Sequence, residues 1–119
     1  MKITPKLYVL AFLLTATTLA HAHAFLDHAD PRVGSTVQAP GKVTIWFTEE
    51  VEIAFSHIKV FDAQGNEVDR KDTKVDPSDK SVLTVSLPKL PPGKYKVAWS
   101  VIAIDTHHTT GTFPFTVAP

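Results

Sequence analysis

The chain has 119 residues, with 12 lysines and arginines, 12 aspartates and glutamates, nine prolines and no cysteine. This length fits one modest domain rather than two. Without cysteine the fold has no disulfide and depends on its hydrophobic core. The balanced charge excludes the strongly basic class of nucleic-acid-binding proteins.

The first 22 residues have the features of an export signal. Two lysines precede an apolar run at residues 7–14, and small residues then lead to Ala22. This run is shorter than the roughly 20 residues that a membrane span requires, so we expect a cleaved leader and no membrane anchor. Cleavage after Ala22 makes His23 the first residue of the mature chain, although the leader also permits cleavage after Ala20, which exposes His21 instead.

Loss of the leader changes the charge of the protein. It removes two lysines and no acidic residue, so residues 23–119 carry ten basic and twelve acidic side chains. The resulting net charge near −2 argues against nucleic acid or an anionic lipid surface as a partner. We therefore expect residues 23–119 to form one exported domain.

Alternating apolar and polar residues predict β-strands along this domain. Such series occupy residues 43–47, 55–62, 82–87, 95–101 and 112–117. Turn-forming residues separate the series, and no helical periodicity of any length appears. The sequence therefore predicts an all-β fold of about seven short strands, a Greek-key sandwich or barrel that is immunoglobulin-like or cupredoxin-like.

His23 is a candidate metal ligand only if cleavage exposes it. A free N-terminal histidine offers its α-amine and a ring nitrogen to the same ion, and the two close a small chelate ring. No internal histidine has this option. The alternative is that a histidine near a cleavage site has no role.

Asp105 and His107 follow the strand predicted at residues 95–101. If the chain stays extended there, both side chains point to the same face with their Cα atoms roughly 7 Å apart. One ion would then fit between them. An Asp-x-His sequence also occurs by chance in solvated turns, so the spacing alone leaves both interpretations open.

Glu49 follows the strand at 43–47 and is a further candidate. It would either bind an ion or accept a hydrogen bond from a ligating imidazole, unless it simply belongs to a solvated acidic loop. We expect His28, His57 and His108 to be surface residues. The sequence has no phosphate-binding glycine loop and no Gly-x-Ser-x-Gly elbow, which argues against nucleotide and hydrolase chemistry.

Several short motifs follow one another along the exported domain: His-Ala-Phe-Leu at 23–26, Asp-Pro at 30–31, Phe-Thr-Glu at 47–49, Pro-Gly-Lys-Tyr-Lys-Val-Ala-Trp at 92–99, Asp-Thr-His at 105–107 and Gly-Thr-Phe-Pro-Phe at 111–115. In this order they resemble the CopC family of periplasmic copper-resistance proteins. The resemblance implies a periplasmic β-sandwich that binds one Cu(II) per chain through His23, Asp105 and His107, with Glu49 as an additional or orienting carboxylate. It also implies cleavage before His23.

The resemblance further implies a monomer that sequesters or delivers Cu(II) in copper homeostasis and resistance, without enzymatic activity. An inner-membrane copper transporter of the CopD type is the partner that it suggests. Some family members also bind Cu(I) in a methionine-rich loop, but Met1 is the only methionine here, and residues 62–76 contain no sulfur. We therefore expect no Cu(I) site.

Two other functions compete with copper binding and delivery. One is a copper-dependent oxidative enzyme of the histidine-brace type, such as a lytic polysaccharide monooxygenase, which has a second histidine where this chain has Asp105. The other is a metal-free structural module with an immunoglobulin-like fold. The metal-free module would be favoured if replacement of His23 by alanine left copper binding unchanged.

Overall fold

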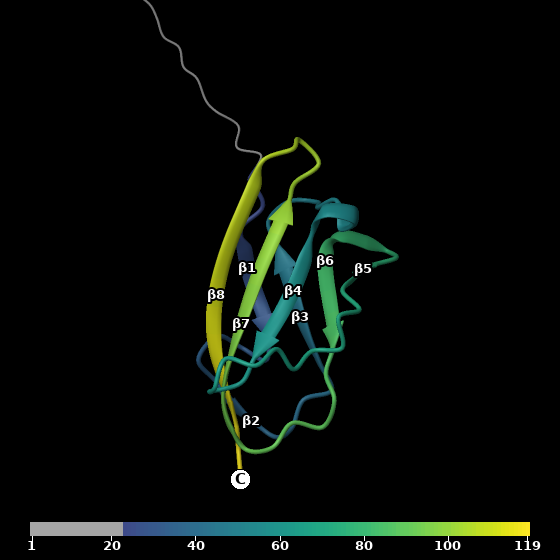
Figure 1. Cartoon of the computed structure of the whole chain (residues 1–119). Helices are drawn as coiled ribbons and strands as arrows, with labels where there is room; N and C mark the ends of the chain where they lie inside the picture. Colours follow the sequence, from purple (N-terminus) through teal and green to yellow (C-terminus); the bar gives the residue numbers. More distant parts are fainter. Residues whose placement is uncertain (1–22) are drawn as a thin grey trace, which may run out of the picture.

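The computed structural model describes residues 23–119, so the predicted leader lies outside the described residues. The described chain forms eight β-strands and one short 3-10 turn, arranged as two four-stranded sheets (Figure 1). The predicted all-β sandwich is confirmed, with eight strands where about seven were expected. Among residues 23–119 no helix has the length and apolar character needed to cross a membrane.

The first five strands alternate between the two sheets, whereas β5 and β6 share the first sheet and β7 and β8 share the second. The first sheet has, in spatial order, β1 (Leu26–Asp30), β3 (Lys42–Phe47), β6 (Asp79–Ser86) and β5 (Lys74–Asp76). The second sheet has β2 (Thr36–Val37), β8 (His108–Val117), β7 (Gly93–Ile102) and β4 (His57–Phe61). All neighbouring strands pair antiparallel except β2 and β8, which pair in parallel.

The core lies between the sheets and follows the predicted alternation. In β7 the buried residues are Tyr95, Val97, Trp99 and Val101. The opposite sheet contributes Val43, Ile45, Phe47, Leu83 and Val85. The rings of Phe47 and Trp99 meet edge to face across the sandwich, with centroids 5.3 Å apart. Because the chain has no disulfide, the stability of the fold depends on the burial of these side chains.

Trp99 also requires a glycine on the neighbouring strand. Gly111 is its register partner in β8, and a Cβ atom added there would lie 2.4 Å from Cζ2 of the indole. Only a residue without a side chain allows the buried indole this close approach to the β8 backbone.

One predicted strand was wrong at its start. Phe55 was expected in a strand at 55–62, but it lies in the 3-10 turn η1 (Ile53–Phe55) and is 66% exposed. The chain turns here because Ser56 supplies side-chain hydrogen bonds. Its Oγ donates to Glu52 O at 2.7 Å and accepts from Ile102 N at 3.0 Å. Strand β4 therefore begins at His57.

Candidate metal centre

The three residues predicted as ligands adjoin one another at one end of the sandwich. The imidazole rings of His23 and His107 stack with their centroids 4.4 Å apart. The carboxylate of Asp105 accepts a hydrogen bond from His107 Nδ1 at 2.6 Å. This end lies at the top of Figure 1, where β7 turns into β8.

Asp105 and His107 lie in a tight turn, so the extended conformation on which their same-face arrangement depended does not form. β7 ends at Ile102, whose register partner His108 begins β8, and the antiparallel pairing requires the chain to reverse between them. Within the turn, Thr106 adopts the left-handed conformation with φ of 77°. The turn thus brings the two side chains together by a different geometry from the one predicted.

The carboxylate of Asp105 holds His107 through both of its oxygens. Oδ1 accepts from the backbone nitrogen of His107 at 3.2 Å, and Oδ2 accepts from Nδ1 of the ring. The side-chain hydrogen bond is the largest cause that holds the pKa of Asp105 below its ordinary value. Because an ionised carboxylate only accepts, the hydrogen lies on Nδ1, and Nε2 is the ring nitrogen left for an ion.

Two threonines hold the first three described residues against the sandwich. The Thr48 hydroxyl accepts from Phe25 N at 3.0 Å and lies 3.4 Å from His23 O, to which it donates. Thr48 N donates to Phe25 O at 2.8 Å. The Thr109 hydroxyl donates to Ala24 O at 2.5 Å, and Ala24 is fully buried. The backbone of His23 is therefore fixed, while its side chain is exposed.

Sequence reasoning did not identify Thr48 or Thr109 as part of the site. Thr48 belongs to the Phe-Thr-Glu motif at 47–49, which was the one available signal for it. The neighbouring Glu49 is exposed, and in the described structure it forms no hydrogen bond or ion pair with His23, Asp105 or His107. Its role as a ligand thus stays a prediction.

The remaining described histidines are exposed, as expected. His28 bonds to Asp27 at 2.7 Å, and its ring stacks on Trp46 with centroids 4.3 Å apart. His108 Nε2 lies 2.7 Å from the hydroxyl of Ser100. Neither contact involves the cluster of His23 and His107.

The cluster is not a preformed metal site. Within residues 23–119 no group of three or more His, Asp or Glu side chains is arranged to hold an ion as it stands. One reason is chemical, because His23 N is a peptide nitrogen in the 119-residue chain and becomes an amine donor only after cleavage before it. The other is geometric, because the rings of His23 and His107 are stacked rather than convergent. Shared coordination would require one ring to rotate.

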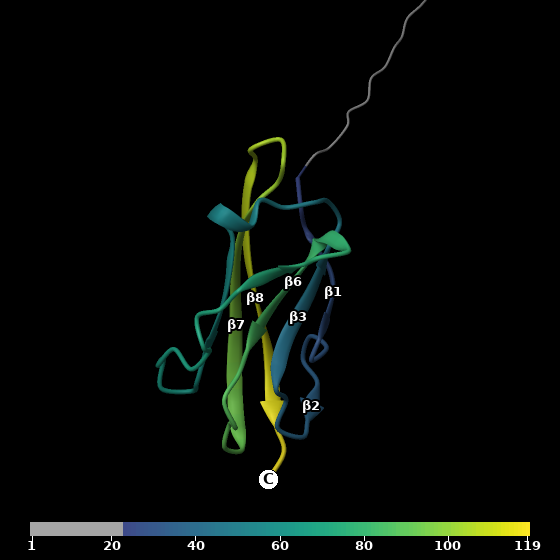
Figure 2. The same ribbon diagram turned by 90° about the vertical axis from the view of Figure 1, so that its right-hand side faces the viewer.

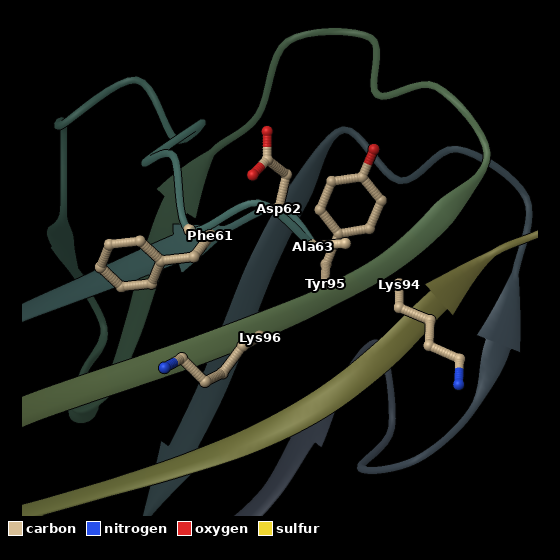
Figure 3. Close-up of a pocket in the computed structure, with 7 residues that line it drawn as sticks. Phe61, Asp62, Ala63, Lys94, Tyr95 and Lys96 are labelled. Carbon is tan, nitrogen blue, oxygen red and sulfur yellow. The ribbon is translucent and has the colours of Figure 1, made fainter.

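An open hollow of about 440 Å³ lies at the opposite end of the sandwich, near the start of β7 (Figure 3). Its lining residues are Phe61, Asp62, Ala63, Gly65, Lys94, Tyr95 and Lys96. Lys96 Nζ lies 5.5 Å from the centre of the Phe61 ring. The lining contains no histidine, so this hollow is separate from the candidate metal centre.

Proteins similar to this chain are named for copper transport and copper resistance. Copper transport protein CutJ of Bacillus subtilis is 33% identical over 111 residues, which cover 92% of this chain and 20% of CutJ. Copper resistance protein C of Escherichia coli is 32% identical over 105 residues, which cover 82% of this chain and 83% of that protein. The chain therefore spans a fifth of the first relative and most of the second.

A solved structure and a family model extend the likeness to the fold. The crystal structure of CopC from Methylosinus trichosporium OB3b superimposes with a TM-score of 0.77 at 35% identity, covering 82% of this chain and 95% of that one. The CopC domain model matches residues 26–118. Since this match takes in nearly all of the described residues, the protein belongs to the CopC domain family.

Proposed function

We propose that this protein binds one Cu(II) per chain through His23, Asp105 and His107, and that it serves copper homeostasis and resistance. The observation that carries the proposal is the contact between the first described residues and the β7–β8 turn. It stacks His23 on His107, which in turn is bonded to Asp105. The names of the relatives, a copper transport protein and a copper resistance protein, support copper as the metal.

The donor set suits the oxidised ion. An α-amine, imidazole nitrogens and a carboxylate in a tetragonal arrangement favour Cu(II), whereas Cu(I) prefers thiolate or thioether sulfur. The sequence contains no cysteine, and its single methionine is Met1. In this proposal His23 supplies its amine and ring, His107 supplies Nε2, and Asp105 supplies a carboxylate oxygen. Glu49 is a fourth residue of the proposed site, a second carboxylate that either binds the ion weakly or orients a ligating imidazole.

The proposal includes export and delivery. Residues 1–22 act as a leader, cleavage before His23 creates the amine donor, and the mature monomer works in the periplasm. An inner-membrane copper transporter of the CopD type is the proposed recipient. Support comes from CutJ, in which the matching region makes up a fifth of a longer protein named for copper transport.

We further propose that the protein is not an enzyme. A carboxylate from Asp105 stabilises Cu(II) and disfavours the redox cycling on which a histidine-brace oxidative enzyme depends. With ascorbate present, the copper-loaded protein should consume oxygen no faster than a copper-bound control peptide. Faster consumption would favour the enzymatic alternative.

The decisive experiment is a Cu(II) titration of the mature protein that begins at His23, with chelator competition and electron paramagnetic resonance. The matched control is the same protein with one additional N-terminal residue, which removes only the free amine of His23. We expect tight one-to-one binding that weakens strongly in the control. Equal binding by both proteins would contradict the proposal and direct attention to His28, His57 and His108.

A further inference from the structure

Large exposed apolar side chains gather at the candidate metal centre. Of the five in the described residues, Phe25 is 53% exposed, Ile53 36%, Phe55 66% and Ile104 56%, and only Val33 lies elsewhere. The Phe25 ring stacks on His23 with centroids 5.9 Å apart. Ile104 precedes Asp105 in the β7–β8 turn, and η1 contributes the other two. We call these four residues the apolar rim.

Backbone hydrogen bonds hold the apolar rim in place. Thr48 N donates to Phe25 O at 2.8 Å, Ile104 N donates to Glu50 O at 3.2 Å, and Glu52 N donates to Ile102 O at 2.8 Å. The segment 48–55 therefore connects the start of β1 to the β7–β8 turn. Figure 2 shows η1 and the start of β1 on either side of this turn, at the upper end of the sandwich. The rim is thus part of the ordered fold.

Acidic side chains outnumber basic ones at this end, where Lys80 is present through the hydrogen bond from Val51 N to Lys80 O at 3.1 Å. The segments that carry the rim and the candidate ligands, 23–26, 48–57 and 102–109, contain Glu49, Glu50, Glu52 and Asp105 but no lysine or arginine. Other basic side chains lie toward the opposite end of the sandwich: Arg32, Lys42, Lys89 and Lys94. A partner that covers the apolar rim would therefore need an apolar centre with basic residues around it.

We propose that the apolar rim is the surface by which this protein docks on the extracytoplasmic face of a membrane copper transporter, directly over its bound ion. The inference rests on the proposed function. An exposed apolar cluster around a binding site is typical of a surface that a partner covers. CutJ indicates the occupant, because there the matching region is joined to a much longer copper transport protein. In this proposal residues 23–119 make the corresponding association with their recipient.

Docking over the ion has a chemical consequence. With the rim covered, the ion at His23 and His107 faces the partner rather than water, so it passes between ligand sets without release into solution. The contact needs only modest area, because a delivery protein must leave after transfer. The acidic side chains would then set the rate and orientation of the encounter more than its strength.

The test uses CutJ from which its own matching region has been removed, purified in detergent and immobilised. The analyte is the copper-loaded mature chain in four forms: wild type, F55S/I104S, V33S and E52K. We expect the double variant to bind about tenfold more weakly or worse, since truncation of central apolar residues commonly dominates such interfaces. V33S removes an equally exposed apolar side chain outside the rim and should bind as the wild type does. E52K should bind more weakly than the wild type, and this difference should be larger at low salt than at high salt.

Several results would overturn the inference. They are unchanged binding by F55S/I104S, equal weakening by V33S, no binding by the wild type, or a dimer in sedimentation velocity that the double variant abolishes, which would make a second copy the occupant. A Cu(II) titration of each variant separates this inference from the proposed function. If all four bind one ion and docking fails, only the docking surface is wrong, whereas absence of copper binding in the wild type contradicts the proposed function itself.

Discussion

Protons compete with Cu(II) for the nitrogen donors of the proposed site at a higher pH than for the carboxylate of Asp105. An ordinary imidazole has a pKa of about 6.5 and an ordinary α-amine about 7.7 to 8.0, so both nitrogen donor types lose Cu(II) to protons as the pH falls. The pKa of Asp105 is held below its ordinary value, so its carboxylate stays ionised over the same range. We expect Cu(II) affinity, measured by chelator competition from pH 8 to 5, to fall steeply below about pH 6.

A variant of Asp105 checks this assignment. D105N removes a carboxylate but no nitrogen donor, so affinity should be weaker at every pH while the steep fall stays below about pH 6. An affinity that is flat from neutral pH to pH 5 in the wild type would contradict the proposed ligand set.

Thr48 should influence copper binding without touching the ion. T48V keeps the shape of the side chain but removes the hydroxyl that bonds to His23 O and Phe25 N. The terminus that forms the chelate then gains freedom, and we expect Cu(II) affinity to fall by about tenfold, with a loss of roughly 1 kcal/mol in the free energy of unfolding.

The matched control for T48V is T84V. Thr84 shares a hydroxyl hydrogen bond of 3.3 Å with Thr44, away from the candidate metal centre. Its loss should lower stability to a similar extent and leave copper affinity unchanged. Equal copper affinities for T48V and the wild type, measured by chelator competition, would show that Thr48 does not position His23.

Among the elements of secondary structure, the long strands with alternating buried positions were predictable from the sequence. The ten-residue strand β7 alternates buried and exposed positions along nearly its whole length, so its period is visible in the sequence. Strands β2 and β5 have two and three residues, too few for any period to appear. The turn η1 is held by the Ser56 hydroxyl, which accepts a hydrogen bond from the distant Ile102 N, a contact that no local sequence pattern contains.

The candidate site was likewise predictable from the sequence only in part. His23, Asp105 and His107 were identified from their chemistry and from the family resemblance, and the structure brings them together. The extended conformation on which the same-face arrangement of Asp105 and His107 depended does not form, because antiparallel pairing of β7 and β8 requires a reversal there. The hydrogen bonds of Thr48 and Thr109 to residues 23–25 join distant parts of the chain, so the sequence alone could not predict them.

The pairing of Trp99 with Gly111 allows a prediction about β7 and β8. G111A places a methyl group 2.4 Å from the buried indole, which has little room to move beside Phe47. We expect the free energy of unfolding to fall by about 1 to 3 kcal/mol, because overpacking of a core displaces rigid side chains. Urea denaturation measures this loss. G41A is the control, since nothing lies within 4 Å of the added Cβ atom there, and destabilisation of both variants alike would contradict the packing argument.

The two ends of the whole molecule differ in charge and in exposed side chains. The end with His23 and His107 is mainly acidic and bears the apolar rim, whereas the open hollow with Lys94 and Lys96 lies at the other end. The sandwich between them has a mainly apolar core that contains no sulfur. In the proposed function, copper binding is therefore confined to nitrogen and oxygen donors at one end.

This confinement predicts how reduction affects the bound ion. Because residues 23–119 contain neither cysteine nor methionine, the mature protein has no soft ligand for Cu(I). Anaerobic ascorbate should thus transfer the copper to the Cu(I) chelator bicinchoninate in full, while the unreduced protein keeps its Cu(II). The variant I104M provides the comparison, since it places a thioether beside Asp105 at a position that is already exposed and apolar. I104M should retain Cu(I) against higher chelator concentrations than the wild type does. If the wild type retains Cu(I) as strongly as I104M, its nitrogen and oxygen donors hold the reduced ion without sulfur, and reduction cannot be the step that releases the cargo.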